Sequence, residues 1–259
     1  MNLTQTEVDT WLDTFLTLDW HSLKAEVRIY PSAIYLKQIV DKDMHVGAQN
    51  VYSESRGAYT GEISIEQLQN IDVQSTLIGH SERRQIFAED NAVITQKVKA
   101  CAQDAFPFIL CCGEALQTRE NGAHLPYVLA QLSENLSQLS ATHLQLLVVA
   151  YEPIWAIGTG LSADAAQVAE MHLAIRNHLV HLYGEAGQLV PILYGGSVNA
   201  ENAAAIFSCP DVDGALVGGA ALNPHTFHQL WQALHSWTTT NFNSRSTILI
   251  LGTISLWPI

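Results

Sequence analysis

The stretch Leu144–Gly160, LQLLVVAYEPIWAIGTG, joins a nearly continuous apolar run to a glutamate and a glycine-bearing loop. The run Leu144–Tyr151 does not alternate polar and apolar residues, which is typical of a strand covered on both faces in a parallel sheet. Glu152 and Pro153 follow where that strand ends. Because chemistry in parallel α/β sheets gathers at the carboxyl ends of the strands, this stretch predicts both the sheet and the position of a site.

Six further apolar runs of this kind are spread along the chain: Val27–Tyr30, His45–Val51, Thr76–Gly79, Phe106–Cys112, Val190–Tyr194 and Gly214–Val217. Helical patterns separate them, and the clearest are Ala163–Tyr183 and His225–Trp237. Strands that alternate with helices predict right-handed βαβ units and one parallel sheet. No linker or shift in composition divides residues 1–240, so we expect a single domain there.

A helix is predicted at the start of the chain. Thr4 and Glu7 have the spacing of a capping box. The apolar residues that follow recur with helical period and form one apolar helical face, made of Val8, Trp11, Leu12, Phe15 and Leu16.

Composition excludes several classes of protein. The chain has 259 residues, 12 basic against 25 acidic, and a formal net charge of −13, which argues against a nucleic-acid partner. Four cysteines at irregular spacing do not predict a disulfide scaffold or a metal site. No signal peptide and no apolar stretch long enough to span a bilayer are visible, so we expect a cytoplasmic protein without a membrane partner.

Polar motifs with glycine follow five of the predicted strands: Gly79-His80-Ser81-Glu82, Cys112-Gly113-Glu114, Tyr151-Glu152-Pro153, Tyr194-Gly195-Gly196-Ser197 and Val217-Gly218-Gly219. In a closed barrel all strand ends converge on one mouth. Motifs on so many successive strands therefore favour a closed barrel over an open sheet.

The same residues resemble one family closely, that of triosephosphate isomerase. The resemblance covers about residues 1–237 and rests on Gly47–Asn50, Gly57–Ser64, Ile78–Arg84, Ala150–Gly160, Leu193–Val198 and Asp213–Gly219. It implies an α/β fold of the (β/α)8 TIM-barrel type and the interconversion of dihydroxyacetone phosphate and glyceraldehyde 3-phosphate, a reaction of glycolysis and gluconeogenesis. It implies no cofactor and no metal.

The resemblance assigns three catalytic positions. Glu152 is the base that removes a proton next to a carbonyl, and the alternative is a glutamate that caps a turn. His80 is a neutral electrophile at a helix start, where the helix dipole disfavours the imidazolium, and the alternative is a structural histidine. Glu82 is a carboxylate close to the substrate, or else a solvated acid in the first turn of the helix.

The phosphate is expected to bind at positions that the resemblance supplies. They are Gly158, Ser197, Leu216, Gly218 and Gly219. Glycine lets backbone N–H groups approach a phosphate closely, and the alternative is a set of plain strand-to-helix turns. Pro153–Gly160 resembles the mobile lid that closes over the substrate, while Cys111 and Glu114 are expected to support the site from below.

A homodimer is implied by the loop Gly57–Ser64. Its tip, Thr60, resembles the part of the family's loop that reaches into the neighbouring subunit, where Gln49 and Arg83 would help to receive it. The alternative is an ordinary polar hairpin tip.

The sequence departs from the family pattern at its start. The family opens with a strand that ends in Asn-x-Lys, and Met1-Asn2 matches the residues directly after that lysine. The sequence thus predicts a barrel without this first strand and with reduced activity, because a cation would be missing from the site. The alternative function is a catalytically impaired barrel that binds phosphorylated ligands or a partner subunit.

Residues 241–259 form an atypical tail. Within it, Ser246–Trp257 is rich in Ile, Leu and Thr. A strand after the last helix would arrive beside the preceding strand by the usual right-handed crossover, so Thr247–Leu251 could replace the first strand. The alternative is a tail with no role, which would be disordered.

Overall fold

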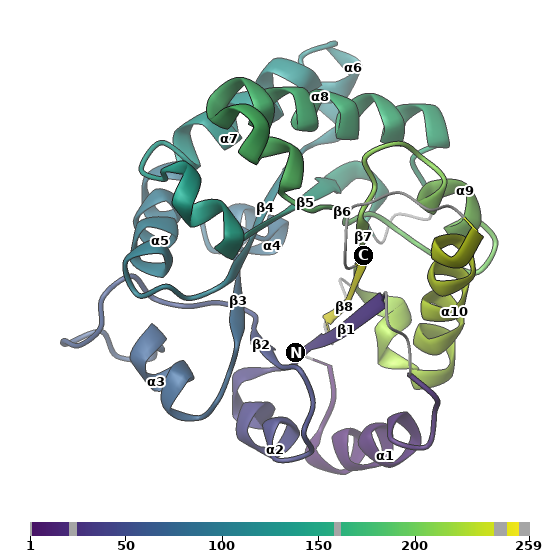
Figure 1. Ribbon diagram of the computed structural model, residues 1–259. Coiled ribbons are helices and arrows are strands. Elements are labelled where there is room, and N and C mark those ends of the chain that lie inside the picture. Colours follow the sequence, from purple (N-terminus) through teal and green to yellow (C-terminus); the bar gives the residue numbers. More distant parts are fainter. Residues whose placement is uncertain (1, 21–24, 158–161, 241–247, 254–259) are drawn as a thin grey trace.

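One ring of parallel strands surrounded by helices makes up the protein (Figure 1). The computed structural model describes residues 2–20, 25–157, 162–240 and 248–253. The strands are β1 (Ala25–Tyr30), β2 (Gly47–Ala48), β3 (Ser75–Ile78), β4 (Phe108–Glu114), β5 (Leu147–Pro153), β6 (Ile192–Tyr194), β7 (Gly214–Val217) and β8 (Ile248–Thr253). All seven predicted strands are confirmed, although β2 is much shorter than the run His45–Val51 suggests.

The sheet closes on itself. Its strands follow the order β1-β8-β7-β6-β5-β4-β3-β2, and every pair is parallel. A parallel bridge between Ile29 and Val46 joins the two ends of this order, and the N–H of Ile29 donates to the carbonyl of His45 at 2.9 Å. The fold is therefore the (β/α)8 barrel that the resemblance implies.

Helices cover the outside of the ring. They are α1 (Gln5–Phe15), α2 (Leu36–Val40), α3 (Ile65–Asn70), α4 (Ser81–Gln85), α5 (Asn91–Gln103), α6 (Leu116–Glu120), α7 (His124–Asn135), α8 (Ala165–Tyr183), α9 (Ala203–Phe207) and α10 (Pro224–Thr240). Short 3-10 turns are η1 (Ala33–Tyr35), η2 (Ala141–Leu146), η3 (Ile154–Ala156), η4 (Gly184–Leu189) and η5 (Gly219–Leu222). The two helices expected near residues 163–183 and 225–237 are confirmed as α8 and α10.

The first helix begins as its sequence predicts and ends at Phe15. The capping box of Thr4 and Glu7 is present, and four of the five predicted apolar positions are buried. Leu16, the last residue of the apolar pattern, is half exposed, because the helix ends at Phe15 and Leu16 is its C-cap. Trp11 fixes the helix to the barrel by donating from its indole N–H to the carbonyl of Ala221 at 2.9 Å.

Two apolar layers hold the barrel together. The larger lies between the strands and the helices. The smaller fills the interior of the ring and contains Tyr30, Leu77, Ile109, Cys111, Ala150, Leu193 and Leu216. The ring of Tyr30 occupies the space next to Gly47, where an added Cβ would lie 2.0 Å from it. Gly47 on β2 therefore leaves the space that the ring of Tyr30 on β1 needs, and a larger residue at position 47 would displace that ring.

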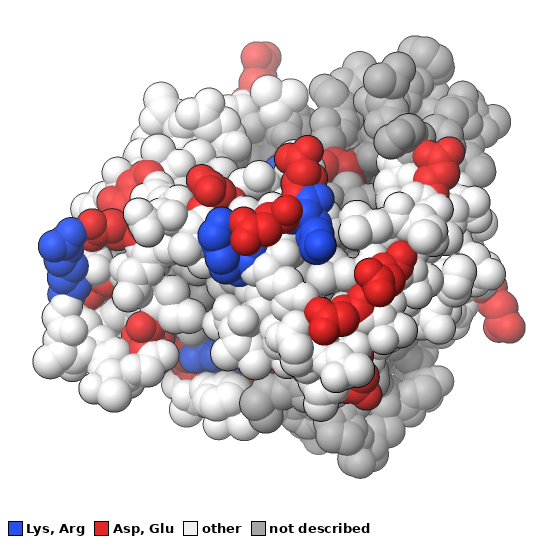
Figure 2. All heavy atoms as spheres, turned by 90° about the horizontal axis from the view of Figure 1, so that it is seen from below, with Lys and Arg blue, Asp and Glu red and all other residues white. Residues whose placement is uncertain are grey.

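The C-terminal strand belongs to the same sheet as the others. Strand β8 pairs with β1 on one side and β7 on the other, and Figure 1 shows the purple β1 and the yellow β8 next to each other. The predicted strand Thr247–Leu251 overlaps it, with Thr247 outside the described residues. Figure 2 shows acidic and basic side chains intermixed on one face of the molecule. Among the described helices, none has the length and apolarity needed to cross a bilayer.

Candidate active site

The motif Gly79-His80-Ser81-Glu82 joins β3 to α4. His80 is the N-cap residue of this helix, and its ring Nδ1 accepts a hydrogen bond from the backbone N–H of Glu82 at 3.4 Å. A nitrogen that accepts carries no proton, so this contact assigns the ring proton to Nε2 and a neutral imidazole. The local fold thereby presents an N–H donor from His80 to the barrel mouth.

Glu152 meets that donor from β5. Its side chain is only 2% exposed, and its Oε1 lies 3.1 Å from Nε2 of His80. The same carboxylate accepts from the backbone N–H of Ser81 at 3.0 Å and from the Ser81 hydroxyl at 3.1 Å. The structure therefore brings the predicted base and the predicted electrophile into direct contact.

Ser81 is a site residue that the sequence reasoning treats only as a position near the helix cap. Its signal is its place directly after His80, because a serine that begins the helix offers both a hydroxyl and a free backbone N–H. Both groups bind Glu152. The first turn of α4 thus supplies donors for the carboxylate as well as the cap for the helix.

Strand β4 packs closely against β5 behind Glu152. A Cβ added to Gly113 would lie 1.8 Å from the carbonyl oxygen of Glu152, so only glycine allows this approach. Cys111 lies in the barrel interior, and burial raises the pKa of its thiol well above the ordinary value, with a further contribution from Glu152. The thiol is consequently neutral and adds no charge to the site.

Glu114 is fully buried below the start of the predicted lid. Its Oε1 accepts from the Tyr151 hydroxyl at 3.0 Å, the Trp155 indole at 3.0 Å and the Arg119 guanidinium at 3.1 Å. Burial also raises the pKa of Tyr151, which keeps its phenol protonated and able to donate. These contacts fix η3, which contains Trp155, to the end of β4, in agreement with the supporting role expected of Glu114.

The described phosphate positions, Ser197, Leu216, Gly218 and Gly219, lie on or after strands β6 and β7. Ser197 follows β6, and its hydroxyl donates to the carbonyl of Ala156 at 2.6 Å. Gly218 and Gly219 follow β7 and begin the turn η5. Leu216 is 3% exposed and belongs to the interior layer of the barrel. Gly158 lies outside the described residues, as does the part of the predicted lid after Ile157.

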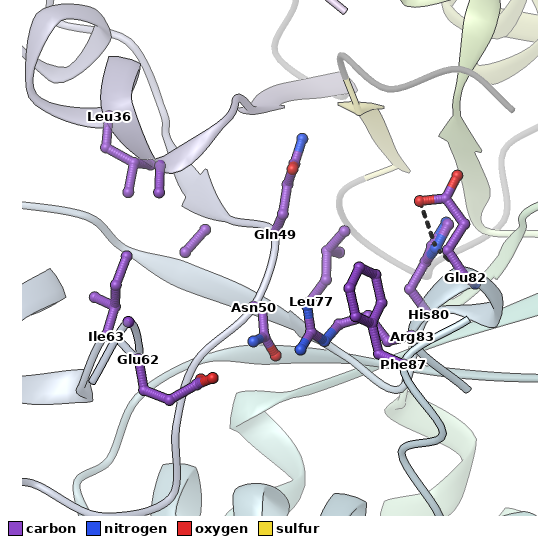
Figure 3. A pocket seen from close by; sticks show the side chains of 13 residues that line it. Leu36, Gln49, Asn50, Glu62, Ile63, Leu77, His80, Glu82, Arg83 and Phe87 are labelled. Atoms are coloured by element: carbon purple, nitrogen blue, oxygen red, sulfur yellow. Dashed lines mark hydrogen bonds and ion pairs between the residues drawn. The ribbon is translucent and has the colours of Figure 1, made fainter. Parts of the chain in front are cut away.

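A cavity of about 320 Å³ opens beside His80. Figure 3 shows Gln49 and Asn50 on one side of it and His80, Glu82, Arg83 and Phe87 on the other. The Oε2 atom of Glu82 lies 3.9 Å from Nδ1 of His80. Glu152 does not line this cavity, so Glu82 faces a space adjacent to the His80–Glu152 pair rather than the pair itself.

The loop Gly57–Ser64 returns to the barrel through paired backbone. The N–H of Tyr52 donates to the carbonyl of Ile63 at 2.8 Å, and Tyr52 forms a parallel bridge with Ser64. The rings of Tyr52 and Tyr59 pack with their centroids 4.6 Å apart. Thr60 is exposed at the tip of this loop, which projects from the barrel next to α3 (Figure 1).

The described lysines are placed away from the His80–Glu152 pair. Lys97 is buried and binds Glu89 and Asn50, and Lys37 pairs with Asp41 on the surface. Lys42 and Lys99 are exposed. Among the described residues, the mouth offers neutral donors, namely the His80 imidazole, hydroxyls and backbone N–H groups, while the Arg83 guanidinium lines the cavity beside His80.

A carboxylate and a neutral imidazole at the mouth of a (β/α)8 barrel define an enzyme that moves protons on a bound substrate. Comparison with known proteins identifies which one. The sequence profile described as triosephosphate isomerase matches residues 1–234. The chain therefore belongs to the triosephosphate isomerase family and is an isomerase.

Individual relatives agree with this result. Triosephosphate isomerase of Cytophaga hutchinsonii is 44% identical over 199 residues, which is 76% of this chain and 79% of that protein. The enzyme of the same name from Amoebophilus asiaticus is 42% identical over 81% of this chain and 85% of its own length. That of Thermodesulfovibrio yellowstonii is 38% identical over 89% of this chain and 94% of its own length.

Proposed function

We propose that the chain interconverts dihydroxyacetone phosphate and glyceraldehyde 3-phosphate, with Glu152 as base and His80 as electrophile. The observation that carries the proposal is the 3.1 Å contact between Glu152 Oε1 and His80 Nε2 at the barrel mouth. This geometry supplies a proton acceptor and a proton donor on one side of a small substrate. The proposed reaction is the one named in the relatives' common name, triosephosphate isomerase.

The reaction moves one proton between two neighbouring carbons and another between their two oxygens. The Glu152 carboxylate removes a proton from the carbon next to the carbonyl, and electrons move onto the carbonyl oxygen to give an enediolate. The Nε2–H of His80 donates to that oxygen and stabilises its developing charge. His80 then passes its Nε2 proton to that oxygen and takes up the proton of the neighbouring hydroxyl, whose oxygen becomes the new carbonyl oxygen. Protonated Glu152 returns its proton to the former carbonyl carbon, which produces the isomer and restores the carboxylate.

Ser81 prepares Glu152 for this task. Its two hydrogen bonds hold the carboxylate at the first turn of α4. Because Glu152 Oε1 contacts both the Ser81 hydroxyl and His80, the carboxylate has to exchange these contacts for the substrate carbon before it can act as base. The substrate oxygen then replaces Glu152 as the acceptor for the Nε2–H of His80.

The phosphate group is expected at Ser197, Gly218 and Gly219, with Gly158 and Leu216 as the further positions implied by the family resemblance. Support comes from the turn η5, which begins directly after β7 and offers backbone N–H groups at the mouth. Closure of the lid over the substrate would exclude water and suppress loss of phosphate from the enediolate. The bond between Ser197 and Ala156 links this phosphate region to η3.

We also propose a homodimer through the loop Gly57–Ser64. The exposed Thr60 tip and the cavity lined by Gln49, Arg83 and His80 belong to one chain, which is what a reciprocal two-fold contact needs. A cytoplasmic location and a role in glycolysis and gluconeogenesis remain predictions of the family resemblance.

A second candidate is a barrel that binds phosphorylated ligands or a partner subunit with little turnover. It is favoured by the placement of the described lysines, because the Lys97 ammonium is committed to Glu89 and Asn50. A missing cation typically costs about 10²–10³ in rate, since charge in the transition state is then less stabilised. In this case the chain would still bind phosphorylated ligands although its turnover is reduced.

The test is an assay of the purified full chain in deuterated water, in both directions. Turnover with deuterium in the product at the carbon that receives the proton supports the isomerase. Tight binding of the triose phosphate by calorimetry without turnover supports the second candidate. If the chain shows no turnover and no binding of the triose phosphate, both candidate functions are refuted.

A further inference from the structure

The C-terminal strand β8 fills the position between the first and the seventh strands of the barrel. Its residues Ile248 to Thr253 pair with Ala25 to Tyr30 along the whole of β1. On the other side Leu249 to Gly252 pair with Gly214 to Val217 along the whole of β7. The last strand in the sequence is therefore the neighbour of the first.

Strands β1 and β7 have little other backbone pairing. Outside β8, β1 is joined to its neighbour by the single bridge between Ile29 and Val46. Among the described residues, β7 pairs with β6 at Tyr194 and Ala215, and the N–H of Asp213, directly before β7, donates to the carbonyl of Ile192 at 2.8 Å. Each of these strands thus depends on β8 for most of its partners in the sheet.

The two strands on either side of β8 contain buried backbone. All of Gly214–Val217 is buried, and so are Ile29 and Tyr30 at the end of β1. Buried backbone N–H and C=O groups need hydrogen-bond partners. Without β8, both strands would expose unpaired groups inside the barrel wall.

We propose that Ile248–Thr253 is a working strand of the barrel that positions the phosphate-binding turn, so that the C-terminal segment is part of the apparatus for substrate binding. The register places Gly252 beside Val217, the last residue before Gly218 and Gly219. Strand β8 also contacts η5, the turn that these glycines begin. The role in binding rests on the proposed function, whereas the role as a barrel strand does not.

The catalytic pair lies elsewhere in the ring. His80 follows β3 and Glu152 lies on β5, and β6 and β7 separate β5 from β8 in the strand order. Loosening β8 should therefore disturb the phosphate turn more than the proton-transferring groups. The expected signature is a larger effect on KM than on kcat.

The first experiment is amide hydrogen exchange on the unmodified full chain. We expect the amides of residues 248–253 to exchange as slowly as those of β1 and β7, because backbone bonds in a closed barrel open only with the sheet. Fast exchange in 248–253 beside slow exchange in β1 and β7 would overturn the proposal. This measurement requires no variant and no activity.

The second experiment compares two substitutions at one position. Ile250 lies between Val27 and Ala215, so Ile250→Pro removes an amide from the middle of the strand, whereas Ile250→Val keeps the amide and the branched side chain. We expect Ile250→Pro to lower Tm by roughly 5–10 °C and to raise KM about 10-fold, with kcat changed by less than about 3-fold. Ile250→Val should resemble the parent chain in all three quantities.

The outcomes separate the two claims. An unchanged Tm in Ile250→Pro would refute β8 as a barrel strand. A lower Tm with kcat reduced more than KM would refute its role in positioning the phosphate turn. If Ile250→Pro does not fold while Ile250→Val does, the strand is essential and hydrogen exchange on the parent chain provides the confirming measurement. A parent chain without isomerase activity refutes the proposed function alone, since Tm and exchange still test the strand.

Discussion

The Nε2 atom of His80 lies 3.1 Å from the Oε1 atom of Glu152, although the two residues come from strands separated by β4. The backbone N–H of Glu82 donates to the other ring nitrogen of His80, which leaves Nε2 as the nitrogen that faces Glu152. The two side chains are thereby held against one another at the mouth of the barrel. This relationship determines the first two predictions.

Glu152→Asp should lower kcat by about 100-fold or more, because the shorter side chain withdraws the carboxylate by about one methylene from the reacting carbon. Binding of the substrate should change much less. Steady-state kinetics in both directions provide the measurement, and Glu185→Asp, at an exposed position, is the matched control. Unchanged turnover in Glu152→Asp would remove Glu152 as the base.

His80→Gln should lower kcat by about 10²–10³, because an amide is a poorer match for the Nε2–H donor aimed at the developing oxyanion. KM should change less, since the loss is felt mainly in the transition state. The exposed His225→Gln serves as control. A variant that raises KM while kcat stays constant would contradict the role of electrophile.

The strands could be predicted from the sequence because burial on both faces removes polar residues from them, as in Leu144–Tyr151 and Gly214–Val217. The site residues at their carboxyl ends followed from the motifs. The contact of Ser81 with Glu152 could not be predicted, because it depends on how the first turn of α4 faces a strand 71 positions away. The end of the first helix at Phe15 could not be predicted either, because helical periodicity does not mark the residue at which a helix ends.

Thr60→Arg should convert a dimer to a monomer, because a long charged side chain at the loop tip cannot enter a cavity that already holds Arg83. Sedimentation velocity measures the change, and activity should fall with it because His80 lines the receiving cavity. Thr10→Arg, on the exposed side of α1, is the control. If the parent chain itself sediments as a monomer at micromolar concentration, the proposed dimer is wrong.

Arg176→Met should destabilise the fold by about 3–5 kcal/mol, because breaking a buried ion pair leaves charges without compensation. The guanidinium is 3% exposed and binds Asp211 at 3.1 Å and Asp213 at 2.9 Å. It also donates to the carbonyls of Gly187 and Val190. Urea unfolding measures the loss, and Lys37→Met, which breaks an exposed pair with Asp41, should cost less than about 1 kcal/mol. Equal effects of the two substitutions would contradict the burial argument.

The free energy of unfolding should decrease as the pH falls, because of a buried histidine on α8. His172 is fully buried, its Nδ1–H donates to the carbonyl of Asp211 at 2.9 Å, and burial lowers the pKa of its imidazole from 6.5 to about 4. In the unfolded chain the ring takes up a proton below about pH 6.5, whereas in the folded chain it stays neutral until about pH 4. The contribution of His172 to the free energy of unfolding is therefore complete above about pH 6.5. As the pH falls to about 4, this contribution decreases by about 3 kcal/mol in total.

The variant His172→Gln isolates this contribution. Glutamine keeps an N–H donor for the Asp211 carbonyl but does not titrate, so all other groups contribute equally to both proteins. We expect the free energy of unfolding, measured in urea at pH 7, 5.5 and 4.5, to decrease more steeply with falling pH in the parent chain than in His172→Gln. Parallel curves would show that His172 keeps an ordinary pKa in the folded protein, and the burial of this ring between Tyr151 and Tyr194 would then have no electrostatic cost.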